Sequence, residues 1–154
     1  MLALQRLAVP DLGIDSEQLL PLLALAAVWI AVWIWICRYL AGHAYGLPDD
    51  ARGLAPWTAW LLLVPGLNLL WNFFFLLGLA SGYRKAFADL GRKLPTRETG
   101  RNEALGWSVA CALGVYPMPQ GLLAVVWLAG FGALVVLLFK LHSLRERYER
   151  IEKG

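Results

Sequence analysis

Two asparagines stand in an otherwise apolar stretch and are the first candidates for chemistry in this sequence. Asn68 and Asn72 are four residues apart, so a helix places both amides on one face. They follow Pro65, which frees backbone groups wherever it interrupts a helix. Amides in a bilayer bond across helices for roughly 1 kcal/mol or less. Together with Trp71, these residues predict a packing corner that joins helices, with a polar solute or ion site as the alternative.

Small residues recur at four-residue intervals in three apolar stretches. Faces of this kind let helix backbones approach closely, and close packing drives helix association in lipid. The pattern fits packing inside one copy of the chain, and it also fits self-association or docking on another membrane protein. The positions are Ala27 and Ala31, Gly78 and Gly82, and Gly106, Ala110 and Gly114.

Residue types that usually carry catalysis or bind cofactors form no recognisable set. Cys37 and Cys111 lack metal-type spacing and read as buried thiols. His43 and His142 are expected in a loop and a tail on opposite faces of a membrane, too far apart to share a haem or metal. No Asp, Glu or Lys lies in the middle of a predicted span, where a charge would mark an ion pathway. We therefore expect no enzyme, cofactor or metal site.

The amino-acid composition indicates the fold in which these residues lie. The chain has 154 residues, of which 59% are hydrophobic and 16% charged, against about 25% charged in a typical soluble domain. A small soluble domain could not bury this much apolar surface. The eight tryptophans are typical of membrane–water interfaces. The sequence predicts an all-α polytopic protein of a bacterial inner membrane with about four transmembrane helices.

The first two spans are predicted at 19–41 and 57–83. The second contains Val64-Pro65-Gly66 in its middle, so two interpretations compete: one kinked helix, or a hairpin of two half-helices. At about 1.5 Å per residue, 57–83 would measure roughly 40 Å, which is one tilted crossing or two short halves. We favour the single kinked span.

The last two spans come from one long uncharged stretch. Residues 104–139 contain no charged side chain, and a single helix of that length would measure about 54 Å, well beyond the bilayer core. Two prolines and a glycine within 116–121 supply the break. The prediction is a hairpin of a short helix at 103–116 and a longer one at 121–141, followed by a helical tail at 142–154.

Orientation follows from the positions of Lys and Arg, which are enriched in cytoplasmic loops. The 84–102 loop holds six cations and the chain from Lys140 onward holds five. Four crossings would place both on the cytoplasmic side, together with both termini. The start of the chain lacks a clear signal-peptide cleavage site, so the first apolar helix is expected to be retained.

The basic loop favours lipid as its partner. It lacks the interleaved aromatic residues typical of single-stranded nucleic-acid binding, so no nucleic acid is expected. Cations near an anionic membrane surface contribute about 1 kcal/mol each. Contacts with anionic headgroups are predicted through Arg84, Lys85, Arg92 and Lys93.

One region resembles a known group of proteins. Residues 54–87 resemble the second helix of uncharacterised multi-span bacterial membrane proteins that carry a domain of unknown function. The resemblance implies a membrane fold and no particular activity. The matching positions are Pro56, Trp60, Leu61, Pro65, Asn68 and Trp71.

These observations predict a non-catalytic accessory, scaffold or assembly subunit that acts through helix–helix contacts and its basic segments. The alternative is a transporter or channel for a small solute or lipid, with a polar corner at Pro65–Asn72. A membrane enzyme ranks last.

Overall fold

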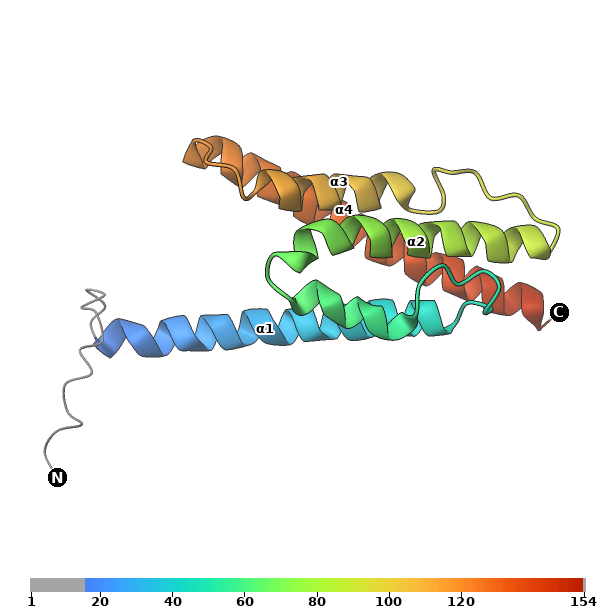
Figure 1. Cartoon of the computed structure of the whole chain (residues 1–154), viewed down its shortest axis with the longest axis horizontal. Helices are drawn as coiled ribbons and strands as arrows, with labels where there is room; N and C mark the ends of the chain where they lie inside the picture. The colour runs from blue at the N-terminus through green and yellow to red at the C-terminus, as the bar shows by residue number, and fades with distance from the viewer. Residues whose placement is uncertain (1–15, 154) are drawn as a thin grey trace, which may run out of the picture. The chain divides into compact units, whose positions relative to one another are not determined.

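The described part of the chain has helices as its only regular secondary structure, as the sequence predicts (Figure 1). The computed structural model describes residues 16–153, with side chains from residue 19 onward. The prediction that the start of the chain has no signal-peptide cleavage site therefore concerns residues outside those described. Two segments, Leu19–Tyr45 and Gln120–Glu152, are long and apolar enough to cross a membrane. The elements are α1 (Ser16–Tyr45), the 3-10 helix η1 (Pro56–Leu63), α2 (Leu67–Asp89), α3 (Arg101–Leu113) and α4 (Gln120–Glu152).

The described residues divide into two compact units, 16–35 and 36–153. The first unit is the opening part of α1, a run of Leu, Ala, Val, Ile and Trp. Nearly every side chain from Leu19 to Trp35 is exposed, and Leu20 is 75% exposed. An exposed apolar face of this extent marks a membrane or protein contact.

In the second unit, α3 and α4 form an antiparallel hairpin (Figure 1). Their backbones approach closely because small residues face each other: a Cβ at Gly130 would lie 2.5 Å from the Cβ of Ala110. The break between the helices falls at 114–119, where Pro117 and Pro119 cannot continue α3. Beyond the apolar part, α4 continues as one helix through the charged tail to Glu152.

The segment around Pro65 is a hairpin, so the prediction of one kinked helix over 57–83 is wrong. Gly66 adopts φ +81°, which favours glycine and reverses the chain between η1 and α2 (Figure 1). Trp71 Nε1 donates to the carbonyl of Thr58 across the hairpin, at 2.8 Å. The alternative of two helices that form a hairpin is the correct one. The two helices are unequal, because η1 is a 3-10 helix of 8 residues and α2 is an α-helix of 23 residues.

The last ten residues of α1 belong to the second unit and pack in its core. Cys37 and Leu40 are fully buried there, and the Tyr39 hydroxyl donates to the carbonyl of Leu138 on α4. Arg52 ends the helix by donating to the carbonyls of Ala44, Tyr45 and Leu47. A basic side chain at a helix C-terminus satisfies carbonyls that lack a helical partner.

An uncharged band runs through the second unit. Lys140 marks one edge, because its Nζ lies 2.6 Å from Glu103 at the start of α3. Gln120 precedes Lys140 by 20 residues, which along α4 is roughly 30 Å. That length equals the thickness of a bilayer's hydrocarbon core. The α3–α4 hairpin is therefore long enough to carry its 114–119 turn across a membrane.

Candidate functional site

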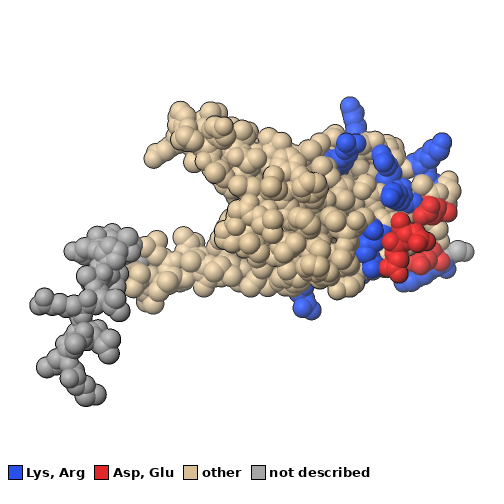
Figure 2. Space-filling view, in the orientation of Figure 1, with Lys and Arg blue, Asp and Glu red and all other residues tan. Residues whose placement is uncertain are grey.

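Most charged side chains of the second unit gather at one end of it (Figure 2). Two segments far apart in sequence meet there, the 90–100 connection and the end of α4. Lys140 Nζ contacts the carbonyl of Arg97 at 2.7 Å, and Arg147 Nη1 lies 3.4 Å from Glu98 Oε2. The basic loop and the basic tail thus lie side by side.

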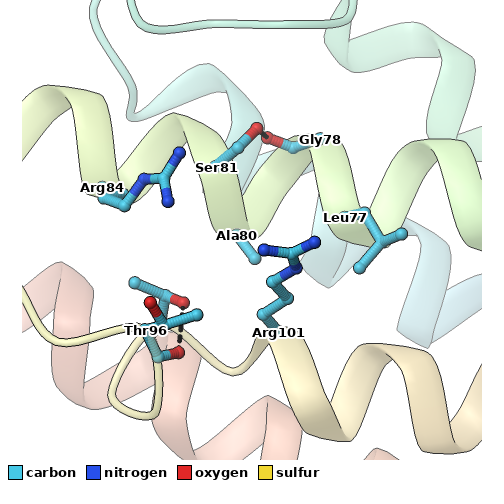
Figure 3. Close-up of a pocket in the computed structure, with 8 residues that line it drawn as sticks. Leu77, Gly78, Ala80, Ser81, Arg84, Thr96 and Arg101 are labelled. Carbon is cyan, nitrogen blue, oxygen red and sulfur yellow. Dashed lines mark hydrogen bonds between the residues drawn. The ribbon is translucent and has the colours of Figure 1, made fainter.

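A cavity of about 330 Å³ opens at this end, between α2 and the start of α3 (Figure 3). Arg101 extends its guanidinium group from the start of α3 toward α2, and the Arg84 guanidinium group lies over α2 (Figure 3). Both side chains line the cavity. Hydroxyl side chains and one apolar wall complete the lining. The remaining lining residues are Leu77, Gly78, Ala80, Ser81, Thr96 and Thr99.

Local chain geometry positions these side chains. Ser81 and Arg84 are three residues apart, so they share one face of α2. The helix ends five residues later, where Arg92 N–H bonds to the carbonyl of Phe87 around Gly91 at φ +71°. Gly100, at φ +76°, then turns the chain into α3 and directs Arg101 back toward α2.

Neither arginine forms an ion pair among the described residues. What distinguishes them from the other unpaired cations of this end is that both line a cavity whose lining contains no carboxylate. Among residues 19–153, no carboxylate lies within ion-pair distance of Arg84 or Arg101, whereas Arg52, Lys140 and Arg147 each have one. A guanidinium presents five N–H donors in a planar fork that suits phosphate and carboxylate oxygens. Two unpaired guanidinium groups on one cavity can together hold an anion.

The tail shows the contrasting, paired arrangement. Arg145 Nε bonds to Glu149 Oε1 at 2.9 Å, one helical turn away. That hydrogen bond lowers the pKa of the Glu149 carboxyl below its ordinary value. Charges of the tail therefore neutralise one another in part, and those of the cavity do not.

Of the four cations predicted to contact lipid, the cavity contains one. Arg84 lines it, and the neighbouring Lys85 is exposed on α2. Arg92 and Lys93 instead line a second cavity of about 530 Å³, beside the tail. Arg101 is one of the six cations of the predicted loop, and only the folded chain places it on the same cavity as Arg84.

The predicted polar corner is closed by its own hydrogen bonds. Asn72 is 1% exposed and donates to the side-chain oxygen of Asn68. Trp107 of α3 donates from Nε1 to Asn72 Oδ1 at 3.3 Å. The amides thus join α2 to α3, with Trp71 holding η1 and Pro65 exposed in the turn. This geometry fits the packing interpretation of the corner.

The small residues of the second unit also pack internally. A Cβ on Gly78 would meet Leu54, and one on Gly82 would meet Leu47 and the Ala51 carbonyl. Gly106 and Ala110 of α3 face Ala133 and Gly130 of α4, and Gly114, which follows α3, faces Trp127 of α4. In the described unit these faces hold one copy together, while Ala27 and Ala31 are exposed in the first unit.

The prediction for His43 is wrong. It lies in the last turn of α1 rather than in a loop, is 1% exposed, and its Nδ1 is 2.7 Å from the Tyr83 hydroxyl. Its bond fixes α1 to α2. His142 is in the tail, 3.2 Å from Glu146. Cys37 and Cys111 are both buried free thiols, as expected.

Comparisons with family models, curated proteins and solved structures return no match to this chain. The resemblance of residues 54–87 to multi-span bacterial proteins therefore stays a prediction. The candidate site rests on its geometry alone.

Proposed function

We propose that this protein is a non-catalytic integral membrane subunit, of accessory or scaffold type, that binds anionic lipid headgroups at its basic end. The observation that carries the proposal is the cavity between Arg84 and Arg101, whose unpaired guanidinium groups lie at the edge of an uncharged band. A phosphate diester is the anion that a bilayer offers at that depth. The bacterial inner membrane remains the proposed location.

The proposed membrane placement follows from length and exposure. α1 and α4 cross the bilayer, and α3 with the 114–119 turn crosses between them. α3 alone, at 13 residues, is about 20 Å long, so the turn must complete the passage. The exposed apolar side chains of α1 and α4 then face lipid, which needs no other partner.

The η1–α2 hairpin changes the proposed topology. Both of its ends lie at the basic end of the second unit, because Ala51 packs on Gly82 and Leu54 on Gly78. A hairpin adds no net crossing, so the crossings become three. With an odd number of crossings, the two ends of the chain are proposed on opposite sides of the bilayer, in place of two cytoplasmic termini. Few cations precede α1, which agrees with the positive-inside rule.

A scaffold fits better than a transporter. The alternative depended on the Pro65–Asn72 corner lining a polar path. Asn68 and Asn72 instead bond to each other and, through Trp107, to α3. Such bonds stabilise a helix bundle, and they occupy both polar side-chain atoms of Asn72 and the side-chain oxygen of Asn68. Contact with a partner protein would fall to the surfaces not used internally, the first unit and the basic end.

The proposal is tested by lipid binding to the purified full chain in detergent. Native mass spectrometry would measure dissociation constants for phosphatidylglycerol and phosphatidylcholine with identical acyl chains. The expected result is tighter binding of the anionic lipid. Arg84→Gln with Arg101→Gln removes two cations, each worth about 1 kcal/mol, so affinity for phosphatidylglycerol should fall roughly 30-fold.

The matched control is Arg150→Gln with Lys153→Gln, which makes the same change in net charge. These residues lie at least ten positions beyond Lys140, about 15 Å farther along α4 and beyond the Debye length of about 8 Å. The control variant should bind phosphatidylglycerol as the wild type does. Equal losses in both variants, or no preference for the anionic lipid in the wild type, would contradict the proposal.

A further inference from the structure

The hydroxyl groups that line the cavity act as hydrogen-bond donors to the backbone. Ser81 Oγ donates to the carbonyl of Gly78 at 2.8 Å, and Thr99 Oγ1 donates to the carbonyl of Thr96 at 2.8 Å (Figure 3). A hydroxyl has one hydrogen to donate and two lone pairs to accept with. Both hydroxyls have therefore used their only donor on the backbone. Toward the cavity they offer lone pairs.

The cavity thus combines two kinds of polar group. Arg84 and Arg101 bring positive N–H donors, and Ser81 and Thr99 bring neutral acceptors. A ligand that satisfies both must carry an anionic oxygen and, a short distance away, a neutral donor. A bare phosphate monoester lacks the donor unless it is protonated. A headgroup ammonium has donors, but two guanidinium groups repel it.

We infer that the Arg84–Arg101 cavity selects a phosphate ester whose headgroup is a neutral polyol, with glycerol as the simplest case. The inference rests on the proposed function and adds the substrate class. In the bound state the guanidinium groups hold the phosphate oxygens, and the headgroup hydroxyls donate to Ser81 and Thr99. No bond is made or broken.

The shape of the cavity assigns the ester to a membrane lipid. Leu77 and Arg84 both line it and are seven residues apart on α2, roughly 10 Å along the helix. One side of the cavity is therefore apolar and reaches into the uncharged band, while the other is charged. At about 330 Å³ it has room for a headgroup, and the acyl chains would leave along the apolar side.

The test compares three lipids with identical acyl chains on the detergent-purified protein by native mass spectrometry: phosphatidylglycerol, phosphatidic acid and phosphatidylcholine. We expect phosphatidylglycerol to bind about 30-fold more tightly than phosphatidic acid, the effect of two net hydrogen bonds of about 1 kcal/mol each. Ser81→Ala removes one of the two acceptors, so it should lower that preference to about fivefold and leave phosphatidic acid affinity unchanged. Ser108→Ala is the matched control, since Ser108 is a fully buried serine of α3 that does not line the cavity.

The outcomes separate this inference from the proposed function. Equal binding of phosphatidylglycerol and phosphatidic acid, with both tighter than phosphatidylcholine, would overturn the polyol selection and leave the anionic-lipid proposal standing. No preference for either anionic lipid would overturn both. Soluble glycerol phosphate binding as tightly as phosphatidylglycerol would overturn the assignment to lipid. A Ser108→Ala loss equal to that of Ser81→Ala would show a structural effect.

Discussion

Replacing Gly130 with alanine tests whether α3 and α4 pack in the register described. The added Cβ would lie 2.5 Å from the Cβ of Ala110, where carbon atoms in contact are normally about 3.5–4.0 Å apart. Ala110 Cβ is attached directly to the backbone of α3, so a helix must shift by about 1 Å. Overpacking of this kind typically costs 1–3 kcal/mol.

The matched control is Gly132→Ala, two residues along the same helix, where nothing lies within 4 Å of the new methyl group. Both variants gain the same helix propensity, up to about 1 kcal/mol, so their difference isolates the clash. A gap of about 1–3 kcal/mol corresponds to melting temperatures about 2–12 °C apart for a chain of this size. Thermal unfolding of the detergent-purified protein, followed by tryptophan fluorescence, measures it.

A second substitution distinguishes the predicted clash from a general loss of folding. Ala110→Gly removes the opposing methyl group, so the double variant with Gly130→Ala should recover most of the lost stability. Equal melting temperatures for Gly130→Ala and Gly132→Ala would refute the register. A double variant that is less stable than Gly130→Ala would refute the contact between these two positions.

Three further variants test other contacts by the same unfolding assay. Gly91→Ala adds only the strain of a left-handed backbone, which should destabilise the protein by about 1–2 kcal/mol. Gly100→Ala adds the same strain and also a clash of the new methyl group with Leu137, so it should destabilise the protein more. Asn72→Leu removes the side-chain oxygen that accepts the hydrogen bond from Trp107 Nε1 of α3 and should cost about 1 kcal/mol. Tyr83→Phe removes the bond to the buried imidazole and should cost about 1 kcal/mol, whereas Tyr116→Phe, exposed in the turn, should cost nothing measurable. No difference between either matched pair, or an unchanged Asn72→Leu, would contradict the corresponding contact.

Much of the helix layout follows from residues that stop helices. Gly91 ends α2, the prolines at 117 and 119 separate α3 from α4, and the uncharged stretch 104–139 is too long for one helix. These signals are local, so the sequence alone predicts them.

The reversal at Gly66 could not be predicted in the same way. Val64-Pro65-Gly66 is compatible with a kink and with a turn, because both relieve the missing N–H of proline. The choice depends on tertiary contacts, chiefly Trp71 with Thr58 and Gly78 with Leu54. Pairings of that kind leave no periodic trace in a single sequence.

Only part of the candidate site could be predicted from the sequence, for a similar reason. Cation counting finds Arg84 and Arg101 as members of a basic loop but does not distinguish them from their neighbours. They become a pair because the chain turns at Gly91 and again at Gly100, and because the carboxylates nearby bond to other cations. Neither fact is readable from spacing.

The central claim is that a bilayer covers the uncharged band, with the basic loop and tail on one side and the 114–119 turn on the other. Single cysteines at Arg97, Met118 and Lys153, in a chain whose Cys37 and Cys111 are replaced by alanine, would test it with a membrane-impermeant maleimide. We predict that positions 97 and 153 are labelled from the same side and position 118 from the opposite side. Labelling of positions 97 and 118 from one side would contradict the account.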